Sequence, residues 1–417
     1  MTDTLATAPA PGHPTADGTP PTHTDQPQTR VGLALLALAT GGFAIGTTEF
    51  VTMGLLPQVA AGTGTDIPTA GHYVSAYALG VVVGAPLVAV LAARLPRKAL
   101  LIGLMVAFAL ANTASGFAHG YSDLMVTRFL SGLPHGAYFG IGSLVAASLV
   151  AKERRTWAVS MMLIGLGTAN IVGVPVTTLL GQRFGWAVPY WVVGGIGAFT
   201  VLALSLWVPR QPSTRGASMR SELTALTRLQ VWLTLLVGVV GFGGMFATYS
   251  YITPTMTELA GFPLGFVPVI LGVYGVGMVS GMVVSGRVAR FGILRGMIVS
   301  LALIAVMLAA FGSLAHLPVL AVIMVFVLGF LPSILVPLLQ TRLMDVAHEG
   351  QSLAAALNHS TLNTANAIGA WLGSLVLSAG LGYEWPSRVG AVLAVLGVGI
   401  ALLSAVLGRR RAYALEA

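Results

Sequence analysis

The chain has 417 residues, of which 56% are hydrophobic and only 8% are charged, and its mean hydropathy is +0.86. Soluble domains carry roughly 25% charged residues, so this composition excludes a soluble globular protein and indicates an integral membrane protein. The sequence has no cysteine, which excludes disulfides and thiolate metal sites.

Residues 1–30 form the first distinct segment of the chain. Positions 1–29 are rich in Pro, Thr, Ala and Asp, and they contain neither a Lys or Arg nor an apolar stretch. A signal peptide needs a basic start and an apolar core, so the composition predicts a disordered cytoplasmic tail. The first membrane helix must therefore direct insertion by itself.

Twelve apolar windows follow the tail. A helix that crosses the roughly 30 Å hydrocarbon core needs about 20 apolar residues. Windows of this kind, separated by charged or turn-rich breaks, predict an all-α membrane protein with twelve transmembrane helices. The expected spans are 31–55, 73–93, 99–117, 122–149, 157–181, 187–208, 230–253, 266–286, 295–314, 318–340, 352–380 and 387–408.

The positions of the cations predict the orientation of these spans. With a cytoplasmic amino terminus, 18 of the 21 Lys and Arg residues fall in segments on the cytoplasmic side. Arg183 and Arg388 fall on the opposite side, and Arg128 lies within a span. Short cytoplasmic loops concentrate Lys and Arg, so both termini are expected in the cytoplasm. The excess positive charge is thus topological, which excludes nucleic acid as a partner.

A polar break divides the twelve spans into two sets of six. The linker is residues 209–229, between an amino-terminal bundle at 31–208 and a carboxy-terminal bundle at 230–408, with a cytoplasmic tail at 409–417. A constant shift along the chain places Gly80, Gly84, Ala92 and Lys98 onto Gly277, Gly281, Ala289 and Arg295. Internal repetition predicts two similar six-helix bundles with a site between them, the arrangement of alternating-access transporters.

Glu49 is the one acidic residue well inside a predicted span. A charge at that depth costs roughly 2.5–3.5 kcal/mol on insertion scales, so a compensating interaction or a function is expected. One interpretation is a carboxyl that is paired for packing or reaches the membrane surface. The other is a proton carrier that takes and releases a proton as a cavity opens to each side.

Arg128 is the matching cation, in the fourth span. Glu49 and Arg128 each lie about six residues, or roughly 9 Å, from the outer ends of their spans, so we expect them to pair. His135 follows Arg128 by seven positions and shares its helix face, where it either titrates or packs. Glu49, Arg128 and His135 are the candidate proton-coupling residues.

Glycines mark two of the spans. Gly132, Gly136 and Gly140 repeat at every fourth position, a spacing that predicts close helix packing. In the fifth span, "GLGTANIVGVP" combines glycines with Asn170 and Pro175, which indicates either a pliable helix near the transport path or a static kink.

Polar and aromatic side chains in four spans are candidate substrate contacts. Aromatic residues of the seventh span either line a cavity or pack, and asparagines of the eleventh span bind a polar substrate or another helix. The candidates are Tyr77, Asn170, Met245, Phe246, Tyr249, Asn358, His359 and Asn363.

Signatures of catalysis and of nucleotide use are missing from the sequence. It contains no Walker-type glycine loop, and its acids and histidines form no catalytic or metal-ligand cluster at motif spacing. We therefore expect no enzyme activity, no bound metal and no cofactor, with an ion gradient as the energy source.

The chain from Val31 to Arg411 resembles the major facilitator superfamily, in its twelve-helix drug:proton antiporter branch. The closest likeness is to bacterial sugar-efflux and chloramphenicol-resistance exporters. It is carried by "GTTEF" and "GLLP" (46–57), "GHYVSAYALGVVVGAP" (71–86), "RFLSGLPHGAYFG" (128–140) and "GTANIVGVP" (167–175). The resemblance implies a location in the bacterial cytoplasmic membrane.

The resemblance also implies roles for individual positions. Residues 89–98, "AVLAARLPRK", stand where the family has the gating-loop signature Gly-x-Leu-Ala-Asp-Arg-x-Gly-Arg-Lys. The cations of that loop match at Arg94, Arg97 and Lys98, but Ala93 replaces the aspartate. Arg128 falls on the fourth-helix arginine that the family links to proton relay, and Glu49 falls on the first-helix acidic position. Gly165, Gly173 and Pro175 resemble the fifth-helix antiporter signature, which is associated with export.

These observations together predict a proton-coupled exporter of small drug-like or amphipathic molecules, such as chloramphenicol-type antibiotics. Protonation of Glu49 would weaken its hold on Arg128 and bias the two bundles between inward- and outward-open states. The expected partners are a small-molecule substrate and membrane lipid, and the expected state is a monomer. Alternatives are a sugar or nucleoside exporter, a uniporter in which Glu49 binds substrate, and a membrane sensor that transports nothing.

Overall fold

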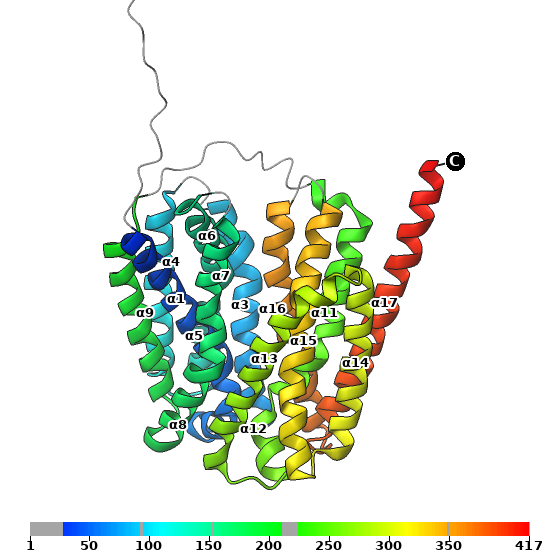
Figure 1. Ribbon diagram of the computed structural model, residues 1–417. Helices are drawn as coiled ribbons and strands as arrows, with labels where there is room; N and C mark the ends of the chain where they lie inside the picture. The colour runs from blue at the N-terminus through cyan, green and yellow to red at the C-terminus, as the bar shows by residue number, and fades with distance from the viewer. Residues whose placement is uncertain (1–27, 92–94, 152–153, 211–223, 348–350, 417) are drawn as a thin grey trace, which may run out of the picture.

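The computed structural model describes residues 28–91, 95–151, 154–210, 224–347 and 351–416. The secondary structure of these residues is helical throughout, with short turns between the helices. Long helices run side by side as upright rods between the two ends of the molecule (Figure 1). We call the end that carries the start of the first helix and the end of the last helix the terminal end, and the opposite end the distal end.

The first six rods contain more helical segments than rods, because two rods are interrupted and one short helix is added at the distal end. They are α1 (Gln28–Gly54), α2 (Leu56–Thr63), α3 (Ile67–Leu91), α4 (Arg97–Ser115), α5 (Tyr121–Gly132) with α6 (His135–Ser148), α7 (Arg155–Thr168) with the π-helical turn η2 (Ala169–Gly173) and α8 (Val174–Phe184), and α9 (Val188–Trp207).

The last six rods are less interrupted. They are preceded by the 3₁₀ turn η3 (Thr224–Thr227) and comprise α11 (Leu229–Tyr249) with α12 (Ile252–Pro254) and the π-helical turn η4 (Thr255–Leu259), η5 (Leu264–Phe266) with α13 (Val267–Ala289), α14 (Ile293–Leu314), α15 (Pro318–Ala347), α16 (Gln351–Ser378) and α17 (Trp385–Glu416).

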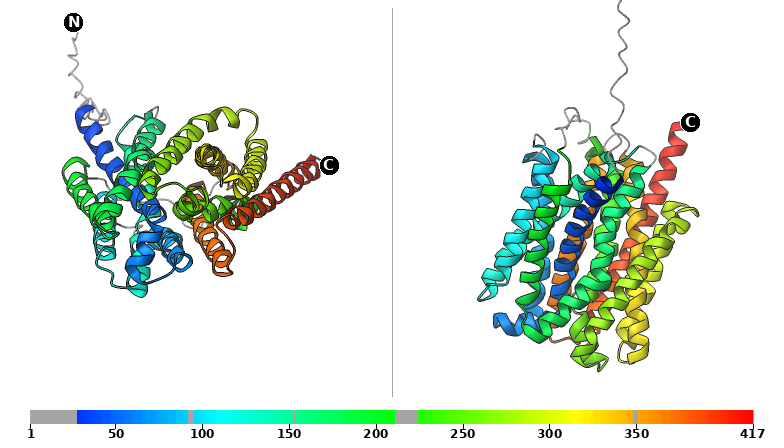
Figure 2. Two further views of the ribbon diagram at one scale, coloured as in Figure 1. Left: turned by 90° about the horizontal axis from the view of Figure 1, so that it is seen from below. Right: turned by 60° about the vertical axis from the view of Figure 1, so that its left-hand side comes forward.

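Twelve rods are therefore present in the described part of the chain, and the predicted fold class is confirmed. Nine of them are long and apolar enough in their described residues to cross a membrane. The other three are α3, α16 and the α5–α6 rod, which is broken at Leu133 and Pro134. The first six rods, coloured blue to green, form one bundle beside the last six, coloured green to red (Figure 2).

The internal repeat found in the sequence is present in the packing of the helices. A Cβ atom on Gly80 of α3 would collide with the Phe129 carbonyl of α5, and one on Gly277 of α13 would collide with the Phe326 carbonyl of α15. The same shift that relates the two glycines also relates the two carbonyls they face. The glycines are needed because only hydrogen fits where the two backbones meet.

A second, longer shift relates other helices of the two bundles. A Cβ on Gly165 of α7 would collide with the Ala39 carbonyl of α1, and one on Gly369 of α16 would collide with the Gly243 carbonyl of α11. Because this shift is longer than the first, the loops of the two halves differ in length. The single shift found between the two halves of the sequence did not reveal this relationship.

The glycine series of the fourth span serves packing only in part. A Cβ on Gly132 would collide with the Tyr77 carbonyl, and one on Gly136 would contact Ala85 at 3.0 Å. Gly140 is exposed and has open space where a Cβ would stand. The prediction that all three glycines allow close helix packing was therefore wrong for Gly140.

Several predicted segments differ from the observed helices or fall outside the described residues. The amino-terminal tail at 1–30 and the linker at 209–229 lie largely outside the described ranges, although η3 falls within the linker. The final helix α17 continues to Glu416, through most of the segment expected as a tail from residue 409.

Hydrogen bonds join the two bundles in the distal half. Thr253 donates its hydroxyl to the carbonyl oxygens of Met53 and Gly54, at 3.1 and 2.9 Å. Ser75 of α3 donates to the Ala367 carbonyl of α16 at 2.9 Å. The interface between the bundles is thus held together directly at the distal end.

Candidate functional site

Glu49 lies in the last two turns of α1 and is 8% exposed. Within the described residues, its carboxylate accepts no hydrogen bond and has no cation within hydrogen-bonding reach. The next residue, Phe50, packs edge-on against Tyr249 and at a tilt against Tyr274 of the other bundle, at centroid distances of 5.8 and 6.3 Å. Glu49 is therefore a buried, unpaired acid at the bundle interface.

Arg128 of α5 is fully buried, and it binds the residue before Glu49 instead of Glu49 itself. Its guanidinium donates to the Thr48 hydroxyl at 2.9 Å and to the Thr48 carbonyl at 3.1 Å. The predicted ion pair with Glu49 is not formed in this structure. The physical reason is that Thr48 offers two oxygens to the guanidinium, and a hydrogen-bonded neutral partner already offsets part of the cost of burial.

The Thr48 hydroxyl has a second role in the same contact. It donates to Asn112 Oδ1 of α4, and Asn112 donates its amide N–H to the Phe108 carbonyl. Three helices of the first bundle are thus joined through Thr48. Arg128 Nε has no hydrogen-bond partner among the described residues, so the guanidinium keeps one donor available.

Two tyrosine rings cover the Arg128 guanidinium. Its Cζ lies 4.4 Å from the ring centroid of Tyr77 on α3 and 5.5 Å from that of Tyr190 on α9. Cations favour the faces of aromatic rings, by about 2 kcal/mol or more when water is excluded. Tyr77, predicted as a substrate contact, therefore also positions Arg128.

His135 lies on the same side as Arg128, as predicted from their spacing, although the rod is broken between them. Its Nδ1 is hydrogen bonded to the Tyr77 hydroxyl at 3.0 Å, so Tyr77 contacts both residues. The His135 ring also meets Phe139 edge-on, and Phe139 lies parallel to His359 of α16 with centroids 5.8 Å apart. A line of aromatic contacts thus connects Arg128 to the second bundle.

The aromatic residues of the seventh span form a packed cluster. Tyr249 stacks on Tyr274 at a centroid distance of 3.9 Å, and the Tyr274 hydroxyl donates to Met245 Sδ at 3.5 Å. Phe246 packs against Phe242 at 5.6 Å. Of this cluster, the Tyr249 hydroxyl has no hydrogen-bond partner among the described residues.

The candidate amides are buried and incompletely hydrogen bonded. Asn170 and Asn363 each donate to the carbonyl one turn earlier in their own helices, which leaves Oδ1 unpaired on both. Asn358 has no described partner for either amide atom. Because buried polar groups in proteins are nearly always hydrogen bonded, these atoms are available to a ligand or to water.

The antiporter-type segment packs against both bundles. A Cβ on Gly165 or Gly173 would collide with α1, at the Ala39 carbonyl and the Thr47 hydroxyl respectively. Asn170 lies in η2, and its carbonyl would be struck by a Cβ on Gly275 of α13. π-Helical turns are rare and are frequent at functional sites, so the irregular backbone here places a pliable element at the interface.

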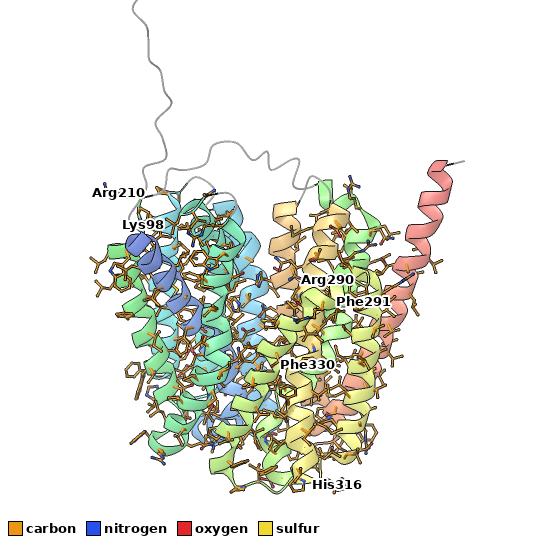
Figure 3. The ribbon with its side chains drawn as sticks, in the orientation of Figure 1. Lys98, Arg210, Arg290, Phe291, His316 and Phe330 are labelled. Atoms are coloured by element: carbon orange, nitrogen blue, oxygen red, sulfur yellow. The ribbon has the colours of Figure 1, made fainter. Side chains whose placement is uncertain are left out.

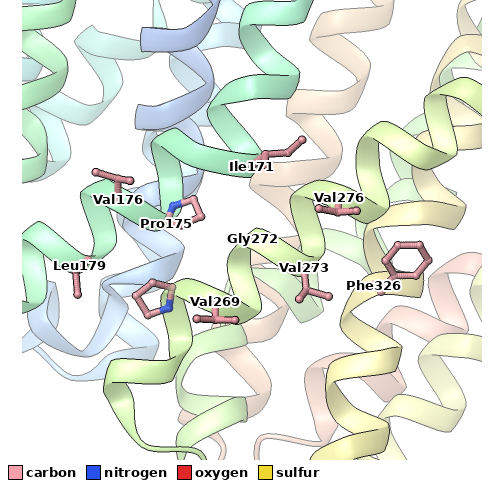
Figure 4. Close-up of a pocket in the computed structure, with 10 residues that line it drawn as sticks. Ile171, Pro175, Val176, Leu179, Val269, Gly272, Val273, Val276 and Phe326 are labelled. Carbon is pink, nitrogen blue, oxygen red and sulfur yellow. The ribbon is translucent and has the colours of Figure 1, made fainter.

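Pro175 lines an apolar groove of about 630 Å³ on the outer edge of the interface (Figure 4). The groove runs between η2 with α8 on one side and α13 with α15 on the other. Its lining residues are Ile171, Pro175, Val176, Leu179, Pro268, Val269, Gly272, Val273, Val276 and Phe326. All of these side chains are apolar, and none of the charged residues of the site is among them.

The predicted gating loop is described only in part. Arg94 lies outside the described residues. Arg97 begins α4, and Lys98 donates to the Ser205 carbonyl of α9 at 2.7 Å. Lys98 lies with Arg210 at the terminal end, whereas His316 marks the distal end (Figure 3). Lys98 thus ties two helices of the same bundle together.

Four residues of the site were missed in the sequence. Thr48, Asn112 and Tyr190 have no distinctive pattern, because hydroxyls and amides are common in membrane helices. Tyr274 could have been found, since the shift that relates Gly80 to Gly277 also relates Tyr77 to Tyr274. In the parts of the chain that the structure describes, no group of three acidic or histidine side chains could hold a metal ion.

Two repeated six-helix bundles, with an unpaired acid at their interface and a buried arginine close to it inside the first bundle, have the architecture of alternating-access transporters. The family comparison agrees, because residues 38–358 match the model of the Major Facilitator Superfamily. The chain belongs to this superfamily. It is therefore a membrane transporter, and nothing in the family indicates a catalytic function.

Curated relatives cover nearly the whole chain. It is 40% identical over 379 residues to the inner membrane transport protein YdhP of Escherichia coli K12, which spans 90% of this chain and 97% of that protein. It is 33% identical to a chloramphenicol resistance protein of Streptomyces lividans, over 84% of this chain and 90% of that protein. A "Probable sugar efflux transporter" of Mannheimia succiniciproducens is 26% identical, over 87% of this chain and 91% of that protein.

Solved structures share the fold. A bacterial homologue of the human lysosomal transporter Spinster, inward-facing and unoccupied, superposes with a TM-score of 0.73 at 14% identity, over 91% of this chain and 98% of that one. A D-xylose–proton symporter superposes with a TM-score of 0.71 at 16% identity, over 89% of this chain and 97% of that one. The apolar helices and the inner-membrane relative support a multi-pass inner membrane protein.

Proposed function

We propose that this transporter exports small organic molecules across the cytoplasmic membrane in exchange for protons. The observation that carries the proposal is the state of Glu49: a buried carboxylate at the bundle interface with neither a hydrogen bond nor a contacting cation among the described residues. A packing carboxyl would have a partner, because a buried unpaired charge is costly. A group that exchanges protons must be free to gain and lose its charge.

The arrangement of Arg128 modifies the mechanism expected from the sequence. Arg128 is bound to Thr48, next to Glu49 on α1, and its charge acts on Glu49 without direct contact. A change in the charge of Glu49 therefore alters the energy of the α1–α5 contact. In this mechanism, that change biases the equilibrium between the inward- and outward-open arrangements of the bundles.

The proposal includes an orientation. The terminal end carries Lys98, Arg210 and most of the other described cations, which favours the cytoplasm for this end and for both termini. The hydrogen bonds of Thr253 and Ser75 then close the extracellular half of the interface. We further propose that the protein works as a monomer in lipid, without a cofactor and with the proton gradient as its energy source.

The substrate of the proposed exporter is a drug-like or amphipathic compound such as a chloramphenicol-type antibiotic. The chloramphenicol resistance relative supports this choice, and the "Probable sugar efflux transporter" supports a sugar or nucleoside as the second candidate. An uncoupled uniporter, in which Glu49 only contacts substrate, is the alternative mechanism.

Proton release on ligand addition tests the proposal. Chloramphenicol or lactose is added to purified, detergent-solubilised protein in weakly buffered solution, and the change in pH is recorded. We expect release from the wild type and none from Glu49→Gln. The matched control is Glu258→Gln, because Glu258 is an exposed carboxylate in η4. Ligand binding without proton release from the wild type would mean that the protein is a uniporter.

A further inference from the structure

Asn366 is a fully buried residue of α16 whose amide nitrogen and oxygen both lack a hydrogen-bond partner among the described residues. Asn358 on the same helix is in the same state, and Asn363 has an unpaired Oδ1. Five amide atoms of one helix are therefore buried and unpaired. Buried polar groups are nearly always paired, so the presence of this many unpaired amide atoms on one helix requires an explanation.

Asn112 shows how this protein satisfies an amide that serves packing. Its Oδ1 accepts from the Thr48 hydroxyl, and its Nδ2 donates to the Phe108 carbonyl. Both atoms of this fully buried side chain are paired inside one bundle. Asn366 has the same side chain and the same burial but neither bond, so packing within its bundle does not account for it.

Asn363 and Asn366 lie on the face of α16 that contacts the other bundle. His359, Asn363, Asn366 and Ala370 follow the spacing of one helix face. At one end of this face, His359 stacks on Phe139 of α6. Near its other end, the Ala367 carbonyl accepts from Ser75 of α3. Asn363 and Asn366 lie between these two contacts, close to the midpoint of α16, where transporters of this architecture bind their substrates.

We propose that Asn366, together with Asn363, binds the hydroxyl or amide groups of an electrically neutral substrate when the bundles separate. This inference rests on the proposed transport function and adds to it the class of substrate. Asn366 offers both a donor and acceptors, and Asn363 offers an acceptor. A hydroxyl both donates and accepts, so a diol or a hydroxyl beside an amide matches this set.

A cation without hydrogen-bonding groups does not match the donors and acceptors of Asn366 and Asn363. Such a ligand would displace water from the amides and leave them unpaired, which is why a site built to bind a hydroxyl discriminates strongly against ligands that lack one. Chloramphenicol, a neutral diol with an amide, and lactose, a neutral polyol, carry the required groups. Tetraphenylphosphonium, an amphipathic cation, carries none.

Binding to an Asn366→Leu variant tests the inference. Leucine has the same number of side-chain heavy atoms and the same branching as asparagine, but it is bulkier and cannot hydrogen bond. Titration calorimetry in detergent would measure the affinities for chloramphenicol, lactose and tetraphenylphosphonium. We expect the affinity for the hydroxylated ligands to fall by about tenfold or more, and that for the cation to be unchanged or higher. Asn363→Leu should act in the same direction but more weakly, because one of its amide atoms is already paired.

The melting temperature of the ligand-free protein separates a binding role from a structural one. Replacing an unpaired buried amide by an apolar side chain removes its desolvation penalty, so Asn366→Leu should melt at the same or a higher temperature. Thr364→Val is the matched control. It lies two positions earlier, about 200° around the helix, and its hydroxyl donates to the Ser360 carbonyl. It should leave all three affinities unchanged.

Three results would overturn the inference. They are an unchanged affinity for the hydroxylated ligands in Asn366→Leu, a lower melting temperature of that variant, and a wild type that binds tetraphenylphosphonium but neither hydroxylated ligand. The proposed function fails differently, namely when chloramphenicol binds the wild type without releasing a proton. In that case Asn366→Leu would still lose the hydroxylated ligands.

Discussion

Arg128 reaches across from α5 to hold Thr48 of α1 by two hydrogen bonds, at 2.9 Å to the hydroxyl and 3.1 Å to the carbonyl. Thr48 passes the connection on to Asn112 of α4. The neighbouring acid Glu49 is left unpaired at the bundle interface. The arginine therefore fixes the position of the acid through the backbone of α1 rather than by neutralising its charge.

Replacement of the Thr48 hydroxyl should expose the importance of this contact. Thr48→Val keeps the shape of the side chain but removes an acceptor from Arg128 and a donor from Asn112. We expect the variant to be destabilised by roughly 1–3 kcal/mol, because two buried groups lose a partner. Thr48→Ser keeps the hydroxyl and should melt close to the wild type. Equal melting temperatures for Val and wild type would contradict a role in stability.

The two functions of Tyr77 can be separated by substitution. Tyr77→Phe removes the hydrogen bond to His135 but keeps the ring under the Arg128 guanidinium. Tyr77→Leu removes both. We expect a loss of about 1 kcal/mol for Phe and a loss larger by about 2 kcal/mol for Leu. Thermal unfolding of the two variants in detergent measures the difference, and equal losses would mean that the ring does not stabilise Arg128.

The sequence predicted the anomalous residues of the site better than their contacts. Counting residues from the outer ends of the two spans correctly placed Arg128 at the depth of Glu49, because the rise per residue of a helix is nearly constant. It could not show that the guanidinium would bind Thr48, since the choice between adjacent partners depends on helix rotation and side-chain conformation. The sequence repeat predicted the matching roles of Gly80 and Gly277, but the second, longer shift was hidden by unequal loop lengths.

Glycine contacts that match in the two bundles should respond alike to substitution. Gly132→Ala and Gly329→Ala would place a methyl group against the Tyr77 and Tyr274 carbonyls respectively, which are equivalent positions of the repeat. Each helix pair must then separate, and we expect about 1–3 kcal/mol of destabilisation for each. Gly140→Ala is the control, because open space lies where its Cβ would stand. Normal folding of both contact variants would contradict the close packing of these helices.

Asp66 provides a test of pH dependence outside the membrane helices. It precedes α3, and Asp66 Oδ1 accepts from the Thr69 backbone N–H at 2.8 Å. Hydrogen bonds from the Thr69 side chain and backbone hold the pKa of the Asp66 carboxyl below its usual value. Because the pKa in the folded state is the lower one, the stabilisation is complete above the unfolded pKa of about 3.9 and is lost as the pH falls through the folded pKa.

The measurement for Asp66 is a comparison of melting temperatures at pH 7 and pH 3. The wild type should melt slightly above Asp66→Ala at pH 7, and the gap should narrow at pH 3. The effect is small because the carboxyl is exposed and screened by water. A gap that widens at low pH would mean that the capping interaction is not electrostatic in origin.

Thr253 of the second bundle is equivalent to Glu49 of the first under the longer shift, the one that also relates Gly165 to Gly369. At this position the second bundle has a hydroxyl that joins the two bundles instead of a charged group. Its hydroxyl bonds the Met53 and Gly54 carbonyls across the distal interface. Because these bonds join the two bundles, Thr253→Val should increase the population that is open at the distal end.

Spin labels can measure this opening, because the chain has no cysteine and labels at Ala61→Cys and Glu258→Cys give no background. Thr257→Val is the matched control, since Thr257 donates to the Thr253 carbonyl of its own segment. We expect a longer distance between the labels in Thr253→Val than in Thr257→Val, because only the former removes bonds between the bundles. Identical distance distributions would mean that other contacts hold the distal end closed.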